Sequence, residues 1–344
     1  LEPTSDEFFV KIYQQETSEG VSILKTGINL PLEGLRNIKN SLRLAKLGVT
    51  LTPKELLDIA STMRTSRLIK ELWKEKKLEN CKIINDLIEG LNIFESIEHK
   101  IAKSILSEDE IADDASPVLS NIRRQKRALA QNIRAKLESI VNSPQYQKIL
   151  QEPIDTIRKD RYVIPIKQEF RGVLSGVIHD QSASGSTLYV EPMTVLSMNN
   201  ELSQKEIEEK KEIERILKEL TEKVENNHDL IFHTWESLIK LDFIMAKASY
   251  SLSISGVEPV YNTRGYINIK KGRHPLLKGN VVPIDVFLGD KFNILVITGP
   301  NTGGKTVSLK TVGLMVLMGQ SGLHIPAEYG TELSIFEEVF ADIG

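Results

Sequence analysis

Apolar residues recur at helical spacing in two long blocks of this chain, and each block predicts one extended helix. The first block, 117–141, has no Gly and no Pro after its first residue, and Ser116 precedes it as an N-cap. Its apolar stripe consists of Leu119, Ile122, Leu129, Ile133, Leu137 and Ile140. The second block, 195–224, carries its stripe on Ile213, Ile216, Leu217, Leu220 and Val224. Because both stripes are narrow and the outer faces are charged, we expect the helices to pair antiparallel as arms of about 40 Å.

Between these blocks the pattern changes to short strand-like runs, which predict a small β-rich tip at the far end of the arms. Strands are expected at 162–166, 176–179 and 187–190. A loop of small polar residues at 181–186 separates the last two strands. The alternative is an ordinary helical bundle with one β-hairpin excursion.

The two ends of the chain are predicted to differ in secondary structure. The first third reads as short helices, one of which should begin at Thr52-Pro53 with Glu55 completing a capping box, and should end near Lys76. A further helix is expected at 229–253. Near the other end, strands at 266–269 and 292–298 should precede a largely buried helix at 304–318, which is the beginning of an α/β unit.

These patterns predict four parts. They are a helical core at 1–116, the arms with their β tip (about 160–192) at 117–226, a returning helix at 227–260 and the first part of an α/β nucleotide domain at 261–344.

Composition narrows the class of protein. With 40% apolar and 26% charged residues in a chain of 344, a disordered state is excluded, and the length predicts two or three domains. Apolar runs such as Val312–Met318 are far shorter than a membrane span, and the chain opens with no signal-like segment. Its single cysteine, Cys81, is expected to be a core residue of a cytoplasmic protein. The net charge of −3 gives no overall attraction to nucleic acid.

A glycine-rich motif of the form G-x-x-x-x-G-K-[ST] lies between the last expected strand and helix. It consists of Gly299, Pro300, Asn301, Thr302, Gly303, Gly304, Lys305 and Thr306. Such a loop surrounds phosphate oxygens with backbone N–H groups at a helix N-terminus. Lys305 would reach the β- and γ-phosphates, and the Thr306 hydroxyl would ligate Mg²⁺. The alternative, a chance glycine-rich turn, does not account for the flanking strand and helix.

Hydrolysis would also need an acidic residue that ends a second core strand. Asp342 is the only downstream candidate, and it is a weak one because its apolar run is short and follows Glu337-Glu338. We expect the chain to stop inside its nucleotide domain.

Basic residues concentrate between Asn121 and Arg171, where twelve Lys and Arg face five acids. The candidates for phosphate-backbone contact on the outgoing arm are Arg123, Arg124, Lys126, Arg127 and Arg134. A solvated helix face is an equally good interpretation of the same pattern. His179-Asp180 has no nucleophile or second His nearby and is expected to be structural, and the other histidines lack metal-ligand spacing.

Several stretches together resemble a known family. They read TPKELLD at 52–58, HDQSASGSTLYVEP at 179–192, GRHPLL at 272–277, GPNTGGKT at 299–306 and GLHIPA at 322–327. The chain resembles the MutS family of ABC-type ATPases, and the stretch from Gln181 to Pro192 is similar to the bacterial branch called MutS-two. That branch lacks the mismatch-reading domain of true MutS.

The resemblance implies a mostly α, multidomain chain, with a helical core or lever and long antiparallel clamp arms, followed by the start of an α/β P-loop ABC-type ATPase domain. It implies a homodimeric cytoplasmic ATPase that uses ATP and Mg²⁺. It also implies that the ABC signature, the Walker B acids, the switch histidine and a Smr nuclease domain lie beyond residue 344, and that a further helix precedes residue 1. We therefore expect no catalytic residue here, and no ATP turnover by this chain alone.

Three functions stay open. One is a clamp ATPase that brings a nuclease to branched DNA and suppresses recombination. Another is an ATPase that splits collided ribosomes and holds ribosomal RNA or protein. The third is a helical scaffold with a degenerate nucleotide site.

Overall fold

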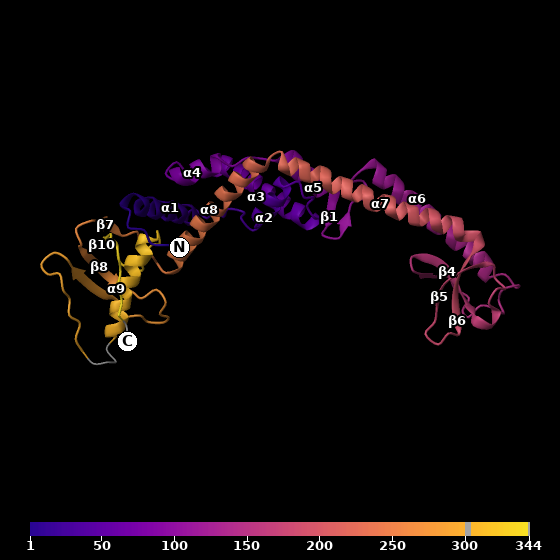
Figure 1. The fold of residues 1–344 in the computed structure, drawn as a ribbon. Helices are drawn as coiled ribbons and strands as arrows, with labels where there is room; N and C mark the ends of the chain where they lie inside the picture. The colour runs from indigo at the N-terminus through magenta and orange to yellow at the C-terminus, as the bar shows by residue number, and fades with distance from the viewer. Residues whose placement is uncertain (300–303, 343–344) are drawn as a thin grey trace. The chain divides into compact units, whose positions relative to one another are not determined.

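The structure is a computed structural model that describes residues 1–299 and 304–342, and it combines helices with several small sheets (Figure 1). Contacts divide the chain into two compact units, each assembled from separated segments. The first unit comprises Leu1–Asn37, Ser61–Glu95 and Asp229–Gly344, and the second comprises Ile38–Ala60 and Ser96–His228. The four-part division stays a prediction, because such contacts do not show which part folds alone.

Two long helices of the second unit, α6 (Pro117–Val141) and α7 (Met193–Glu225), lie side by side (Figure 1). Ser116, the N-cap of α6, donates to Glu212 at 2.6 Å, and Arg123 pairs with Glu209 at 2.7 Å. Toward the other end of α6, Leu137 shares a buried cluster with Leu202. In these contacts the residue numbers on α7 fall as the residue numbers on α6 rise. The two helices are therefore antiparallel, and the predicted pairing is confirmed.

A four-stranded antiparallel sheet packs against the far ends of α6 and α7. Its order is β3 (Thr156–Arg158), β4 (Arg161–Lys167), β6 (Thr187–Pro192) and β5 (Gly176–Gln181). Ile164 and Leu188 of the sheet meet Ile133 and Val195 of the helices in one core. The three predicted strands are confirmed as β4, β5 and β6, whereas β3, which is too short to show an alternating pattern, was missed.

The helix α3 (Pro53–Lys76) contributes residues to both units, and its predicted limits are confirmed. The Thr52 backbone N–H donates to Glu55 Oε2 at 2.9 Å, and the Glu55 N–H donates back to Thr52 Oγ1 at 3.3 Å, which is the expected capping box. The remaining elements of the second unit are α2 (Lys39–Lys46), α5 (Glu95–Ser104), β1 (Ile105–Ser107), β2 (Glu110–Ile111) and the 3₁₀ turn η1 (Gln168–Phe170).

Helices α1 (Glu7–Lys25), α4 (Lys82–Glu89) and α8 (His228–Ser253) form the helical part of the first unit together with the end of α3. Their core includes Ile23, Trp73, Ile84 and Leu241. Cys81 lies in this core with 1% of its surface exposed, as predicted, and burial raises the pKa of its thiol. The predicted helix at 229–253 is confirmed as α8.

The rest of the first unit is a four-stranded sheet with one helix beside it (Figure 1). The strand order is β7 (Val260–Asn262), β10 (Glu332–Ser334), β8 (Ile267–Gly272) and β9 (Ile284–Leu288). Met315 of α9 (Lys305–Gln320) packs on Ile269 and Leu333 of the sheet. Among the described residues no helix is long and apolar enough to cross a membrane.

Two expectations for this region are wrong. Residues 292–298 are not a strand, and Ile294 and Val296 are 79% and 75% exposed. An apolar run becomes a strand only where another strand pairs with its backbone, and none of the described strands does so here. The helix at 304–318 exists as α9, but it is not largely buried, because Val307 and Leu309 near its start are exposed.

His324 lies buried where the loop after α9 meets α1 and α8. Its Nδ1 is 2.7 Å from Ser251 Oγ, and its Nε2 is 2.9 Å from Ser18 Oγ, which in turn donates to Glu258. Burial, with smaller effects from the charges of Lys25 and Lys247, lowers the pKa of His324 to about 4. The folded protein therefore holds this ring neutral.

The free energy of unfolding should fall as pH drops from 6.5 toward 4, by about 3 kcal/mol from this group, because the unfolded chain binds the His324 proton first. Urea unfolding at pH 7 and pH 4.5 measures this. The variant His324→Asn should be less stable at pH 7 but should lose less stability on acidification. Equal losses in the two proteins would contradict the assignment.

Candidate functional site

The glycine-rich motif leads directly into the first turn of α9. Gly304 is the N-cap and has φ of 80°, a left-handed conformation that favours glycine. Lys305 and Thr306 begin the helix, and Gly299, with φ of 147°, stands on the other side of the loop. The predicted residues Pro300, Asn301, Thr302 and Gly303 lie outside the described residues.

The described part of the motif has room and positive charge for a phosphate group. Among the described residues, and apart from the adjoining ones, no atom lies within 4 Å of the position that a Cβ would take at Gly299 or Gly304. The Lys305 ammonium donates to the Gly299 carbonyl at 2.6 Å, so it lies across the mouth of the loop, next to the N–H groups that begin α9. These groups fit the phosphate chain of a nucleotide.

Metal-binding groups at this site are few. Thr306 is exposed at the start of α9, and the described residues contain no cluster of three or more His, Cys, Asp or Glu side chains that could hold a metal. Asp342 lines a cavity of about 810 Å³ beside the later turns of α9, from Leu309 to Leu317. The expectation that this chain does not contain the second acid stays a prediction.

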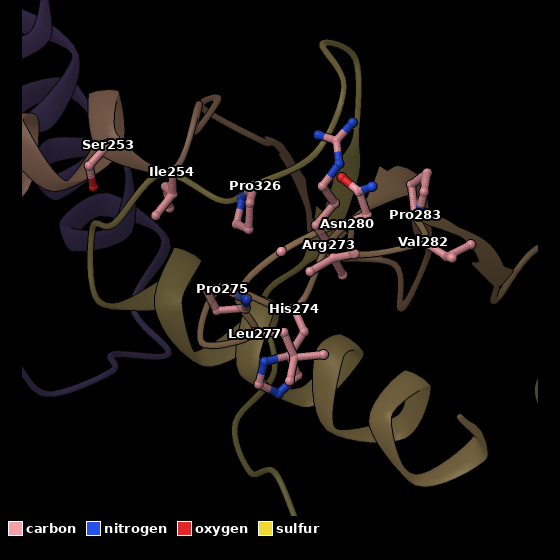
Figure 2. A pocket seen from close by; sticks show the side chains of 12 residues that line it. Ser253, Ile254, Arg273, His274, Pro275, Leu277, Asn280, Val282, Pro283 and Pro326 are labelled. Carbon is pink, nitrogen blue, oxygen red and sulfur yellow. The ribbon is translucent and has the colours of Figure 1, made fainter. Parts of the chain in front are cut away.

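A second cavity, of about 630 Å³, lies beside the segment that follows β8 (Figure 2). Its apolar wall comes from Val281, Val282 and Pro283, and Arg273 and Asn280 add polar groups. His274 lines both this cavity and the one beside α9. The two hollows therefore share a wall near the helix that follows the motif.

The predicted basic residues on α6 fall into two classes. Arg123 pairs with Asp113 at 2.6 Å and Glu209 at 2.7 Å, and Lys126 pairs with Glu209 at 2.6 Å. Arg127 also pairs with Asp113, at 3.0 Å. Burial acts to raise the pKa of Glu209, but hydrogen bonds from Lys126 and Arg123 outweigh it and hold that pKa below its ordinary value. These three cations are largely neutralised within the chain.

The other basic residues of α6 face solvent. Arg124 donates only to the neutral side chain of Asn121, at 2.8 Å, and Arg134 lies over the ring of Tyr162. Lys136 is exposed, and neither it nor Arg124 makes an ion pair within the described ranges. From Pro117 to Leu137 the sequence of α6 contains no acid. The helix therefore carries three exposed cations at separate points around its surface, Arg124, Arg134 and Lys136, which we call the exposed basic set of α6.

His179 is held by a buried carboxylate in the sheet at the end of the arms. Its Nε2 lies 2.5 Å from Oε2 of Glu191, which is fully buried and also pairs with Arg161 at 3.3 Å. Asp180 lies 3.8 Å from Lys159. These contacts give His179 and Asp180 structural partners within the sheet, in line with the expectation for this pair.

Comparison with known proteins identifies the family. The model of MutS domain V matches residues 295–344. The chain is 50% identical to Endonuclease MutS2 of Alkaliphilus metalliredigens over 333 residues, which are 96% of this chain and 42% of that protein. It is 49% identical to Endonuclease MutS2 of Alkaliphilus oremlandii and 47% identical to that of Clostridioides difficile, and it covers 44% of each. The chain belongs to the MutS2 branch of the MutS family. It spans less than half the length of these relatives.

Sequence reasoning missed one group of residues that contacts the helix leading away from the motif. Gln14 and Thr17 of α1 bind the main chain at the far end of α9, the helix that begins with Lys305. The available signal was polarity: these side chains occupy the same helical face as Val10 and Val21, where an apolar residue is expected.

Proposed function

We propose that this MutS2-branch chain binds ATP through Gly299–Thr306 and contacts the phosphodiester backbone of a nucleic acid through the exposed basic set of α6. The observation that carries the first part is the open, left-handed N-cap at Gly304, with the Lys305 ammonium across the loop. The first N–H groups of α9, at the positive end of the helix, are suited to phosphate oxygens.

Each residue of the motif has a separate task in this proposal. The first N–H groups of α9 donate to phosphate oxygens, and Lys305 exchanges its bond with the Gly299 carbonyl for one with a terminal phosphate. The Thr306 hydroxyl is the group of this chain that would hold Mg²⁺. The metal, when bound with the nucleotide, would offset the charge of the phosphates.

The cavity beside Val281–Pro283 is the proposed place for the base. Val282 is 81% exposed, so its side chain offers uncovered apolar surface to a ring face. Arg273, His274 and Asn280 offer polar groups at the rim (Figure 2). Apolar walls with a few polar groups are typical of ligand sites.

For the full-length protein we propose a dimeric ATPase that acts on DNA, because its relatives carry the name endonuclease. The exposed basic set of α6 suits backbone contact without base reading, and branched DNA presents such a backbone in several directions. Ribosomal RNA offers the same phosphates. Competition between branched DNA and ribosomes for the full-length protein distinguishes the two targets.

Lys305→Ala should weaken ATP binding by roughly 10- to 100-fold, because a hydrogen bond to a charged group contributes about 1.5–3 kcal/mol. Titration of the full-length protein with a fluorescent ATP analogue measures the change. The matched control is Lys310→Ala, which removes an exposed lysine from the same helix and should leave affinity within about twofold. Tight binding by Lys305→Ala would refute the site.

Arg124→Gln with Lys136→Gln should flatten the dependence of log affinity on log salt by about one unit for each phosphate that the variant no longer neutralises. The control pair, Arg123→Gln with Lys126→Gln, removes the same charge from the inward, ion-paired side of α6. Binding of duplex DNA is measured between roughly 50 and 200 mM salt, where such binding changes steeply. If both pairs change the slope equally, α6 acts only through its net charge.

A further inference from the structure

Among the described residues, the helix that begins with the motif is closely packed only over its second half. All of its buried residues lie between Thr311 and Gln320, and none of residues 305–310 is buried. A 16-residue helix is about 24 Å long, so a tilt of about 5° at the buried end would move the first turn by about 2 Å. The position of Lys305 and Thr306 therefore depends on how the far end of α9 is fixed.

That far end is fixed by two polar side chains of α1. The Gln14 amide donates to the carbonyl oxygens of Gly319 at 2.8 Å and Leu323 at 2.9 Å. Thr17 donates to the carbonyl oxygen of Gly322 at 2.5 Å and is fully buried. These carbonyls belong to the last turn of α9 and the loop after it, where the Gly319 oxygen also accepts the Gly322 N–H at 2.9 Å.

Glycine at two of these positions allows the close approach. A Cβ at Gly322, where φ is 77°, would lie 2.4 Å from the Tyr13 Cβ of α1. A Cβ at Gly319 would lie 2.3 Å from the Tyr261 hydroxyl. The loop after α9 therefore lies tightly against α1, and the last turn of α9 lies tightly against Tyr261 of β7.

The orientation of the Gln14 amide carries a cost that packing alone does not explain. Gln14 is 1% exposed, and its Oε1 has no hydrogen-bond partner among the described residues. Rotating the amide would place Oε1 against two carbonyl oxygens, so the two donated bonds fix it. An unpaired buried acceptor is unfavourable by about 1–3 kcal/mol. In the folded chain, Gln14 donates its two hydrogen bonds at the end of α9 in spite of this unfavourable term.

The opposite side of α1 is tied to the helical core of the same unit. Glu19 accepts the backbone N–H groups of Ile83 and Ile84 at 3.1 and 2.9 Å, at the start of α4. Buried Glu16 pairs with Lys247 of α8 at 3.4 Å. A movement of α1 relative to α4 or α8 would therefore break buried polar contacts.

We propose that Gln14 and Thr17 are positioning residues of the nucleotide site, which act through α9 and set where its first turn lies. This inference rests on the proposed ATP site for its functional meaning, but its mechanical part concerns α9 alone. It predicts that the exposed start of α9 becomes less ordered when its distant anchor is removed.

The test compares isosteric variants of the full-length protein. Thr17→Val removes the hydroxyl at constant shape, and Thr17→Ser restores it. The control is Thr234→Val, another buried threonine of the first unit, which accepts a bond from Asn92 far from α9. Hydrogen exchange of the peptide that covers 305–312 is measured without nucleotide, followed by ATP affinity.

We expect Thr17→Val to raise exchange at 305–312 at least fivefold and to weaken ATP binding by a similar factor, and we expect Thr17→Ser to reverse both. Thr234→Val should change neither the exchange at 305–312 nor the ATP affinity by more than twofold, even if it lowers the melting temperature as much as Thr17→Val does. If Thr17→Val and Thr234→Val raise the exchange at 305–312 by the same factor, the positioning role is refuted. If wild-type protein does not bind ATP, the proposed function fails, while the exchange data still decide the role of Thr17.

Discussion

The hydrogen bonds between α1 and the main chain at the end of α9 are the constraint on which the first unit depends. Gln14, Glu16, Thr17 and Glu19 are all buried on one helix of 19 residues, which gives α1 buried polar groups on two opposite sides. Buried polar groups are stable only where they make hydrogen bonds or ion pairs. The buried polar side chains of α1 therefore fix the positions of α4, α8 and the loop after α9. Apolar contacts would have allowed small shifts of α1 that these directional hydrogen bonds do not allow.

Charge in the second unit is organised by the same need for partners. Arg123 and Lys126 face α7, where Glu209 compensates them, so they stabilise the pairing of the arms. Arg124 and Lys136 differ from them in position on the helix and not in chemistry. The local excess of positive charge therefore overstates what a bound nucleic acid would meet, because part of it is already neutralised by the fold.

Sequence patterns predicted the parts of the structure whose determinants are local. The Ser116 cap, the box at Thr52 and Glu55, and the spacing of the glycine-rich motif all act over a few residues. The error at 292–298 arose because strand formation needs a neighbour that composition cannot reveal. The bond from Thr17 to Gly322 joins residues 305 positions apart, and the local pattern shows only a polar residue on an apolar face, without its partner. The nucleotide site was therefore predicted from its own residues, whereas the contacts of α1 with the end of α9 were not predicted.

The buried thiol of Cys81 gives this chain a practical property. Thiolate is the form that reacts with maleimide dyes, and a side chain with 1% exposure and a raised pKa presents very little of it. A cysteine introduced at the exposed positions Ala128→Cys or Ala135→Cys of α6 would thus take a dye without removal of the native one. Paired with a second label on the first unit, it would let single-molecule fluorescence follow the arms of an otherwise unaltered protein.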